Sequence, residues 1–213
     1  MEIRVEHLRA ALTLAPFDDE AARERMIHPH RFDVPPPPRW TEAAVLVLFY
    51  PGPAGLTLLL TRRTDRLDHH RAQISCPGGA REGEESLLDA ALREAEEEVG
   101  VPPGEVEVLG PLAPLRIPVS GYLVHPFVGV LSRRPDLRPD PREVAEVIEA
   151  PLAHLLRAEA RSEADLVYGG RVRRVPVFDL PGVGPPPLWG ATAMILSGLI
   201  ERLRAVTRQA VGP

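Results

Sequence analysis

Four carboxylates crowd the last turns of a helix that the sequence predicts to end at Gly100. They belong to Glu94, Glu96, Glu97 and Glu98. The C-terminal end of a helix carries partial negative charge, and like charges four residues apart cost about 0.2–0.5 kcal/mol per pair. A stable fold that keeps this arrangement therefore requires a compensating interaction close to the helix end.

Helical projection places three of these glutamates in one patch on the helix surface and the fourth on another side. Glu94, Glu97 and Glu98 are related by steps of three and four residues, whereas Glu96 points toward solvent. Two carboxylates about 4 Å apart repel by about 4 kcal/mol at an effective dielectric of about 20, so the patch predicts a bound cation. Oxygen-only ligands indicate Mg²⁺ or Mn²⁺. The alternative is a solvated acidic face on a surface helix.

The apolar stripe beside the patch, expected to face the core, consists of Leu88, Ala91, Leu92, Ala95 and Val99.

A fixed pattern of residue types surrounds the glutamates between positions 79 and 101. Aliphatic residues occupy positions 95 and 101, and the other specified positions are Gly79, Glu85, Arg93, Glu94, Glu97, Glu98 and Gly100. This pattern resembles the Nudix box of the Nudix hydrolases, and its spacing makes it a specific signal. The resemblance implies hydrolysis of a nucleoside diphosphate linked to another group, a reaction that divalent metal ions support.

The resemblance also implies roles for individual residues. Arg93 and Glu85 are expected to form an orienting ion pair. Gly78 and Gly79 are expected to let the loop pass close to metal and substrate, because glycine permits close backbone approach. The metal ligands implied by the resemblance are Glu94, Glu97, Glu98 and the backbone carbonyl of Gly79.

The box and a segment outside it each offer a candidate for the general base. Glu94 can serve from within the box. Outside the box, residues 141–147 resemble the family's loop segment that contributes a further glutamate near the metals, and we favour Glu143 over Glu146. For both residues of that segment, a solvated charge at a strand edge is the alternative.

Two segments outside the box resemble the coenzyme A diphosphatase branch of the family. The first includes residues 59–63 together with Leu67, His70 and residues 77–79, and the second is residues 188–193. This resemblance implies that coenzyme A is cut to 3',5'-ADP and 4'-phosphopantetheine. Three cationic or imidazole side chains beside the box are suitable donors to an additional substrate phosphate, namely Arg62, Arg63 and His70. The first segment differs from the usual residues of that branch at Thr64, Asp68, Ala72 and Cys76.

Two other functions remain open at this point. The same chemistry could act on ADP-ribose, NADH or a dinucleotide polyphosphate. A different class is a non-catalytic Nudix-like domain that senses a nucleotide or binds a partner. Such a domain need not keep the metal carboxylates, so the complete set of glutamates argues against it.

Length, charge and composition limit which classes of protein this chain can belong to. With 213 residues, of which 44% are apolar, the chain can bury a full core. A net charge of −5 disfavours a broad nucleic-acid-binding surface. No apolar run approaches about 18 residues and the start has no signal-peptide hydrophobic region, so we expect a soluble cytoplasmic protein without membrane contact. The single cysteine, Cys76, excludes an intramolecular disulfide.

Apolar periodicity predicts the order of the elements. Helices and a proline-rich spacer are expected to form an N-terminal extension over residues 1–40, which caps the active site or builds a homodimer interface, and the Nudix domain follows over 41–213. The element order supports an α+β or mixed α/β class, and the resemblance implies the more specific Nudix α/β/α sandwich with a mixed sheet. The predicted helices are 4–12, 18–27, 152–157 and 188–206 besides the box helix, and the predicted strands are 43–50, 56–61, 106–109, 112–117, 123–131, 143–150, 166–168 and 171–178.

Overall fold

A computed structural model describes residues 2–27, 34–64, 72–168 and 170–210. Its longest strand, β1 (Thr41–Gly52), has different antiparallel partners along its two halves. The first half pairs with β4 (Gly78–Ala80), and the second half pairs with β2 (Gly55–Arg63) in the predicted hairpin. On its other side, β1 runs parallel to β7 (Tyr122–Val130). The sheet is therefore mixed, as the sequence predicted.

The remaining strands of this sheet extend it at both sides. β2 also pairs antiparallel with β3 (Ile74–Ser75) and with β8 (Val144–Pro151). β7 pairs antiparallel with β5 (Glu107–Pro111) and β6 (Leu115–Ile117). The β1–β2 hairpin thus joins a β4–β1–β7 part of the sheet to a β3–β2–β8 part.

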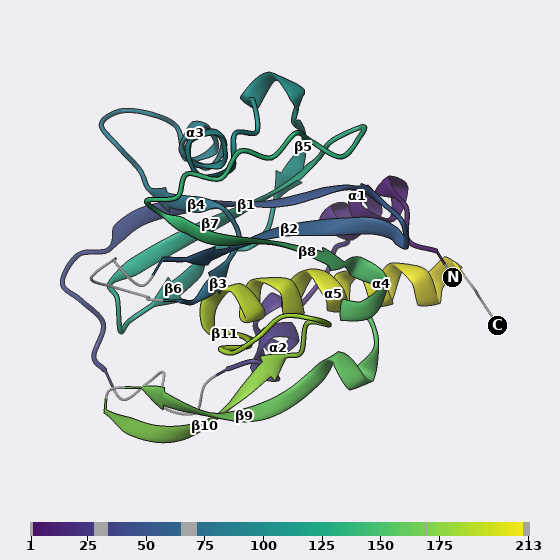
Figure 1. Cartoon of the computed structure of the whole chain (residues 1–213). Coiled ribbons are helices and arrows are strands. Elements are labelled where there is room, and N and C mark those ends of the chain that lie inside the picture. Colours follow the sequence, from purple (N-terminus) through teal and green to yellow (C-terminus); the bar gives the residue numbers. More distant parts are fainter. Residues whose placement is uncertain (1, 28–33, 65–71, 169, 211–213) are drawn as a thin grey trace.

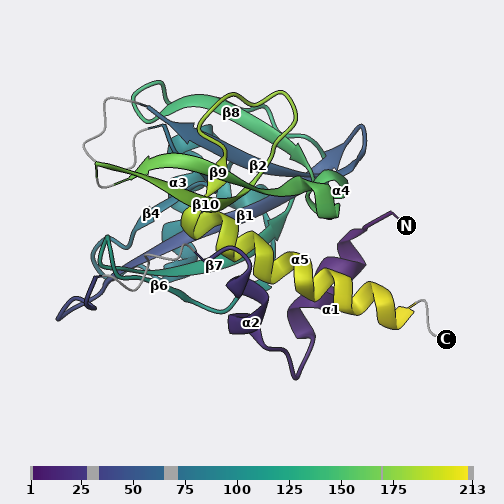
Figure 2. The same ribbon diagram turned by 90° about the horizontal axis from the view of Figure 1, so that it is seen from below.

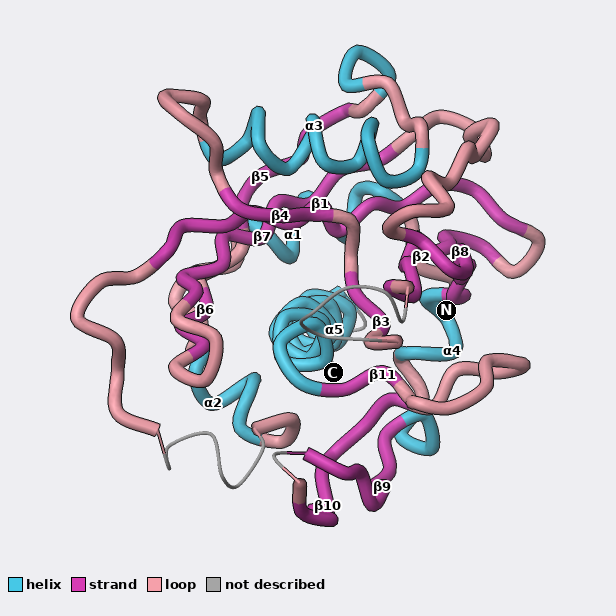
Figure 3. The backbone as a smooth tube through the Cα atoms, turned by 60° about the vertical axis from the view of Figure 1, so that its left-hand side comes forward, coloured by secondary structure: helices cyan, strands magenta, loops and turns pink. Residues whose placement is uncertain are grey.

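Helices cover the two faces of the sheet (Figures 1 and 3). α3 (Leu87–Val99), the predicted box helix, lies on one face. The long helix α5 (Gly190–Ala210) lies on the other face with α1 (Val5–Thr13), α2 (Asp19–Glu24) and α4 (Leu152–Leu155). This arrangement confirms the predicted α/β/α sandwich. None of the helices in the described ranges is long and apolar enough to cross a membrane.

Both faces of β1 are buried, which explains its continuous apolar run. Ala44, Leu46 and Leu48 belong to the core beneath α3. Val47 and Phe49 belong to the core on the α5 side. The same alternation continues in β2, and it decides which side chains of that strand reach the box helix.

A second sheet of three antiparallel strands leads into α5. It consists of β9 (Arg161–Tyr168), β10 (Arg171–Phe178) and the short β11 (Leu188–Trp189). β9 begins five residues earlier than predicted, because pairing with β10 overrides the low strand propensity of Glu163 and Asp165. Single turns of 3₁₀ helix precede β5 at Pro103–Glu105 and β9 at Ala158–Ala160.

The N-terminal helices pack against α5 (Figure 2). Leu8, Ala11 and Met26 are buried in the same core as α5. Arg202 of α5 forms an ion pair with Asp19 of α2 at 2.7 Å. The N-terminal segment therefore completes the core on the α5 side. Its predicted boundary at residue 41 and its part in a homodimer stay predictions.

Candidate active site

The helix that carries the box glutamates is fixed at both ends. At its start, the Ser86 hydroxyl accepts a hydrogen bond from the Asp89 N–H at 3.1 Å. At its end, Gly100 adopts a left-handed conformation with φ of +73°, which confirms the predicted stop. Glu96 is exposed, as the projection predicted. The fully buried members of the predicted stripe are Ala91, Ala95 and Val99, whereas Leu88 and Leu92 are partly buried.

Glu98 lies between α3 and β2 and is only 3% exposed. One of its carboxylate oxygens accepts a hydrogen bond from the Thr61 hydroxyl at 3.3 Å. The other oxygen accepts one from the Gly78 N–H at 3.4 Å and lies 3.7 Å from the Arg63 guanidinium. Thr61 and Arg63 reach the same carboxylate because residues two apart on a strand share a face.

The electrostatic environment of Glu98 disfavours its charge. Burial raises the pKa of Glu98 to about 7 against the opposing effects of Arg63 and the Gly78 N–H. The carboxylates of Glu94 and Glu143 raise this pKa further. A cation among these carboxylates would favour the ionised form of all three.

Arg93 is the centre of a group of ion pairs beside Glu98. Its Nη1 donates to Glu94 and to Glu97, each at 3.0 Å. Its Nε and Nη2 donate to the two carboxylate oxygens of Glu85, at 3.1 and 3.0 Å. The predicted Arg93–Glu85 ion pair is thus present, and Nη2 also donates to the Ala80 carbonyl at 3.2 Å.

The pKa values of Glu85 and Glu94 move in opposite directions around Arg93. Hydrogen bonds from Arg93 hold the pKa of Glu85 below its ordinary value. Burial raises the pKa of Glu94 despite Arg93, and the Glu97 and Glu143 carboxylates add to the rise. Glu85 is therefore a stable anionic partner for Arg93. The ionised form of Glu94, by contrast, would be stabilised by additional positive charge nearby.

Two glycines of β4 face this group closely. A Cβ at Gly79 would lie 2.3 Å from Oε1 of Glu94, so the Glu94 carboxylate occupies the space that a side chain would need. Gly78 has φ of +156°, and a Cβ there would lie 2.3 Å from the Ala44 carbonyl oxygen. A larger residue at Gly78 would meet backbone atoms, whereas one at Gly79 would displace the end of the Glu94 side chain. The close approach of this loop to metal and substrate stays a prediction.

Arg63 lies between the box helix and the segment that precedes β8. Its two terminal nitrogens lie 3.7 Å from Glu98 and 3.9 Å from the Glu143 carboxylate. The Glu143 side chain is 44% exposed, so solvent reaches it. The structure thus brings Glu143 into the group that contains Glu98 and Glu94, and it places Arg63 against carboxylates.

Arg62 points to the opposite side of β2. Its Nε donates to Glu146 at 2.7 Å, and its terminal nitrogens donate to the carbonyls of Gly184 at 2.9 Å and Pro185 at 3.3 Å. With its side chain only 11% exposed, Arg62 anchors the loop between β10 and β11. Its predicted contact with a substrate phosphate would require these hydrogen bonds to break. His70, the third predicted phosphate donor, lies outside the described residues.

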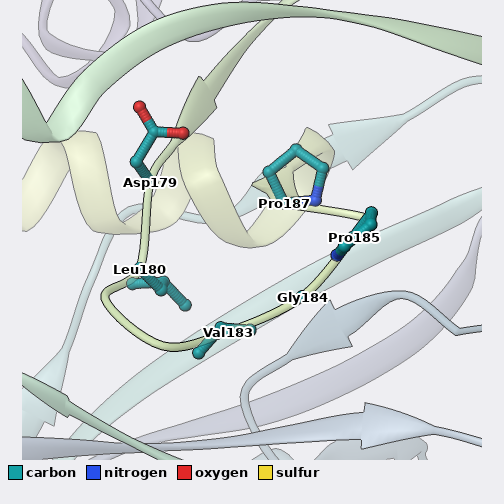
Figure 4. A pocket seen from close by; sticks show the side chains of 6 residues that line it. All are labelled: Asp179, Leu180, Val183, Gly184, Pro185 and Pro187. Carbon is teal, nitrogen blue, oxygen red and sulfur yellow. The ribbon is translucent and has the colours of Figure 1, made fainter.

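The anchored loop borders a hollow of about 260 Å³ (Figure 4). Gly184 and Pro185, whose carbonyls accept from Arg62, belong to its lining. Glu94, Glu97 and Glu98 are absent from this lining, so the hollow and the predicted metal ligands are separate features of the fold. The other lining residues are Asp179, Leu180, Val183 and Pro187.

The predicted metal ligands differ in their surroundings. Glu94 and Glu97 accept hydrogen bonds from Arg93, while Glu98 is buried against Thr61. Across the described ranges, no three His, Cys, Asp or Glu side chains are already gathered as a metal site. Arg93 engages one oxygen each of Glu94 and Glu97, so the second oxygen of each is the one that could act with Glu98 on a cation. The oxygen-only donor set fits a hard divalent ion, as does the rise in the pKa values of Glu94 and Glu98, which comes first from burial and then from neighbouring carboxylates.

Thr61 was not singled out from the sequence as a site residue. The predicted strand ends at Thr61, whereas β2 continues to Arg63, so the shared face of these two residues follows only from the longer strand. Glu98, the residue that Thr61 and Arg63 both contact, could not be identified without the packing of α3 on β2.

Comparisons with known proteins agree with this geometry. Residues 40–168 match the NUDIX domain family model. A protein of Photorhabdus laumondii, described as an uncharacterized Nudix hydrolase NudL, is 38% identical over 182 residues, which cover 82% of this chain and 94% of the relative.

Solved structures show the same fold. The Nudix hydrolase RenU from M. smegmatis aligns with a TM-score of 0.51 and 23% identity, over 79% of this chain and 86% of that chain. A MutT/nudix family protein from Enterococcus faecalis aligns with a TM-score of 0.53 and 19% identity, over 100% of this chain and 81% of that chain. The family model, the extended sequence match to NudL and the complete box, whose Glu94, Glu97 and Glu98 lie on α3, agree. The chain belongs to the Nudix hydrolase family and is a hydrolase of diphosphate bonds in nucleoside diphosphate-linked substrates.

Proposed function

We propose that this Nudix hydrolase cuts the diphosphate of coenzyme A, or of its acylated derivatives, to 3',5'-ADP and 4'-phosphopantetheine. The observation that carries this proposal is the position of the segment that resembles the coenzyme A diphosphatase branch. That segment includes residues 59–63 at the end of β2, where Thr61 donates to Glu98 at 3.3 Å and Arg63 lies 3.7 Å from it. Residues that set the resemblance to this branch therefore border the carboxylates of the box.

The carboxylates Glu94, Glu97 and Glu98 would hold Mg²⁺ or Mn²⁺, together with the Gly79 carbonyl. Bound metal supplies charge neutralisation of the diphosphate oxygens and lowers the pKa of water. Arg93 orients Glu94 and Glu97 through its Nη1 and is itself fixed by Glu85. The protein's part in this reaction is mainly position and charge.

Glu143 is the preferred general base. Its carboxylate interacts electrostatically with Glu94 and Glu98, and its side chain is 44% exposed, so it can take a proton from a water molecule at the edge of the group. Glu146 is less suited, because its carboxylate is engaged by the Arg62 Nε at 2.7 Å. Glu94 remains the alternative base within the box.

A substrate panel tests the proposal. The purified protein is incubated with coenzyme A, acetyl-CoA, dephospho-CoA, ADP-ribose, NADH and diadenosine tetraphosphate, each with Mg²⁺, with Mn²⁺ and with EDTA. Mass spectrometry identifies the products. We expect 3',5'-ADP and 4'-phosphopantetheine from coenzyme A with either metal, and none with EDTA.

Other outcomes separate the alternatives. Turnover of ADP-ribose, NADH or the dinucleotide with no turnover of any coenzyme A derivative would reject the proposed substrate while keeping the diphosphatase chemistry. Equal turnover of coenzyme A and dephospho-CoA would show that the additional 3'-phosphate is not recognised. A homodimer and a cytoplasmic location stay predictions beside this proposal.

A further inference from the structure

Thr64, the residue that follows β2, binds the segment in front of β8 through two hydrogen bonds. Its N–H donates to the Glu143 carbonyl at 2.9 Å, and its hydroxyl donates to the Arg142 carbonyl at 3.0 Å. Thr64 is 7% exposed, so this contact is largely shielded from water. The hydroxyl therefore fixes the peptide that links Arg142 to Glu143, and apolar side chains of similar size cannot replace it.

A bulge in β8 lies beside this contact. Arg62 pairs with Glu146, but the next residue of β2, Arg63, pairs with Val144, so Ala145 is an additional residue on β8. Bulges re-aim the side chains of the strand that carries them. Here the carboxylate of Glu146 engages Arg62, whereas that of Glu143 lies 3.9 Å from Arg63.

Arg63 then links Glu143 to the box helix. Its guanidinium lies between the Glu143 and Glu98 carboxylates, at 3.9 and 3.7 Å. Neither distance is that of a close hydrogen bond, so Arg63 attracts both carboxylates without fixing the backbone of either. Closer bonds position the Glu143 backbone: its N–H donates to the Asp140 carbonyl at 3.0 Å, and Thr64 binds the carbonyls of Arg142 and Glu143.

We propose that Thr64 is a positioning residue for the hydrolysis, whose hydroxyl holds the Arg142–Glu143 peptide so that the Glu143 carboxylate faces Arg63 and Glu98. This inference rests on the proposed function, in which Glu143 is the general base. A base of this kind contributes about 10²–10⁴-fold to the rate, and a displacement of about 1 Å can remove about 10²-fold. Loss of the hydroxyl should therefore lower kcat more than it changes KM.

Three substitutions test the role of the hydroxyl. Thr64→Val removes the donor and keeps the shape, and we expect kcat to fall about tenfold or more with little change in KM. Thr64→Ser keeps the donor and should restore most of kcat. The matched control is Thr57→Val, at the other end of β2, where a threonine that is 4% exposed receives the same substitution without a change in kcat. Thr64→Ala also removes the hydroxyl donor and should lower kcat as Thr64→Val does. Thermal unfolding checks that each variant is folded.

A double-mutant cycle with Glu143→Gln separates positioning from general structural support. If Thr64 acts through Glu143, Thr64→Val lowers kcat in the parent protein but adds nothing in the Glu143→Gln background. Hydrogen exchange of residues 140–146 should also be faster in Thr64→Val than in Thr64→Ser. Additive losses in the cycle, or an unchanged kcat in Thr64→Val, would overturn the positioning role alone. Full activity of Glu143→Gln would instead reject Glu143 as the base, and the inference with it.

Discussion

Gly79 and Glu94 approach each other so closely that a methyl group at position 79 would lie 2.3 Å from Oε1 of the Glu94 carboxylate. The obstructing atoms belong to the far end of a flexible side chain, so Gly79→Ala should displace the carboxylate and leave the fold intact. We expect kcat/KM to fall by about 10²-fold, because this displacement exceeds about 1 Å. Steady-state kinetics at saturating metal, together with thermal unfolding, measure the two effects.

The control for this substitution is Gly104→Ala. A Cβ at Gly104 meets no atom within 4 Å, and its φ is not positive, so neither activity nor stability should change. Equal activity of Gly79→Ala and Gly104→Ala would show that the position of Glu94 is unimportant for turnover.

Neutral replacement of Glu97 or Glu98 should lower turnover while the protein stays folded. We expect Glu97→Gln and Glu98→Gln to lose at least about 10²-fold in kcat, because each removes a carboxylate from the predicted metal site. Thermal stability should be kept or raised, since the like charges at the helix end decrease. Glu96→Gln, on the exposed side of the same helix, is the control with unchanged turnover. Unchanged turnover in both variants would remove the proposed metal site.

Glu98 should also make the stability of the metal-free protein depend on pH. Its pKa is about 7 in the folded protein, against an ordinary value of 4.5, so between these values the folded protein holds a proton that the unfolded chain has released. The free energy of unfolding therefore falls as the pH rises through this window, by up to about 3 kcal/mol, and is level above it.

Urea unfolding in EDTA, from about pH 4 to about pH 8, measures this effect when the parent protein is compared with Glu98→Gln. The parent should become less stable than the variant as the pH rises, because only the parent carries the buried charge. Parallel curves for the two proteins would mean that the pKa of Glu98 is not raised on folding.

Arg93→Lys should lower activity even though it keeps the positive charge. A lysine cannot donate to both oxygens of Glu85 while also reaching Glu94 and Glu97, because it lacks the planar fork of arginine. We expect kcat/KM to fall about tenfold or more, and the metal concentration needed for half-maximal activity to rise. Arg133→Lys, at a side chain that is 78% exposed, is the control. Comparable kinetics for both variants would contradict the orienting role of Arg93.

Periodicity and caps predicted most of the elements correctly. The continuous apolar run before residue 50 became β1, and Gly100 ended the box helix in a left-handed conformation. Projection of that helix correctly identified Glu96 as solvent-exposed. These features depend on local sequence, so they are accessible without knowledge of the fold.

Contacts between distant segments were not accessible in this way. The two-residue strand β3 and the three-residue strand β4 carry too little periodicity to be recognised, although β4 supplies Gly78 and Gly79. Arg62 and Arg63 looked equivalent as phosphate donors. Because β2 extends to Arg63, alternation puts them on opposite faces, and the pairing with β8 and the packing of α3 decide that Arg63 meets the carboxylates.

The register at Ala44 has a consequence for the order in which the protein assembles. Ala44 pairs with Gly79 on one side and with His125 on the other, so strands from three distant parts of the chain meet there. Such non-local pairings form slowly, whereas a helix such as α3 forms in about a microsecond. On its own, however, a 13-residue helix with like charges at its end is only marginally stable. The box helix therefore becomes stable only when β1 and its partner strands form the surface beneath it, so assembly of the sheet sets the moment at which the glutamates take their places.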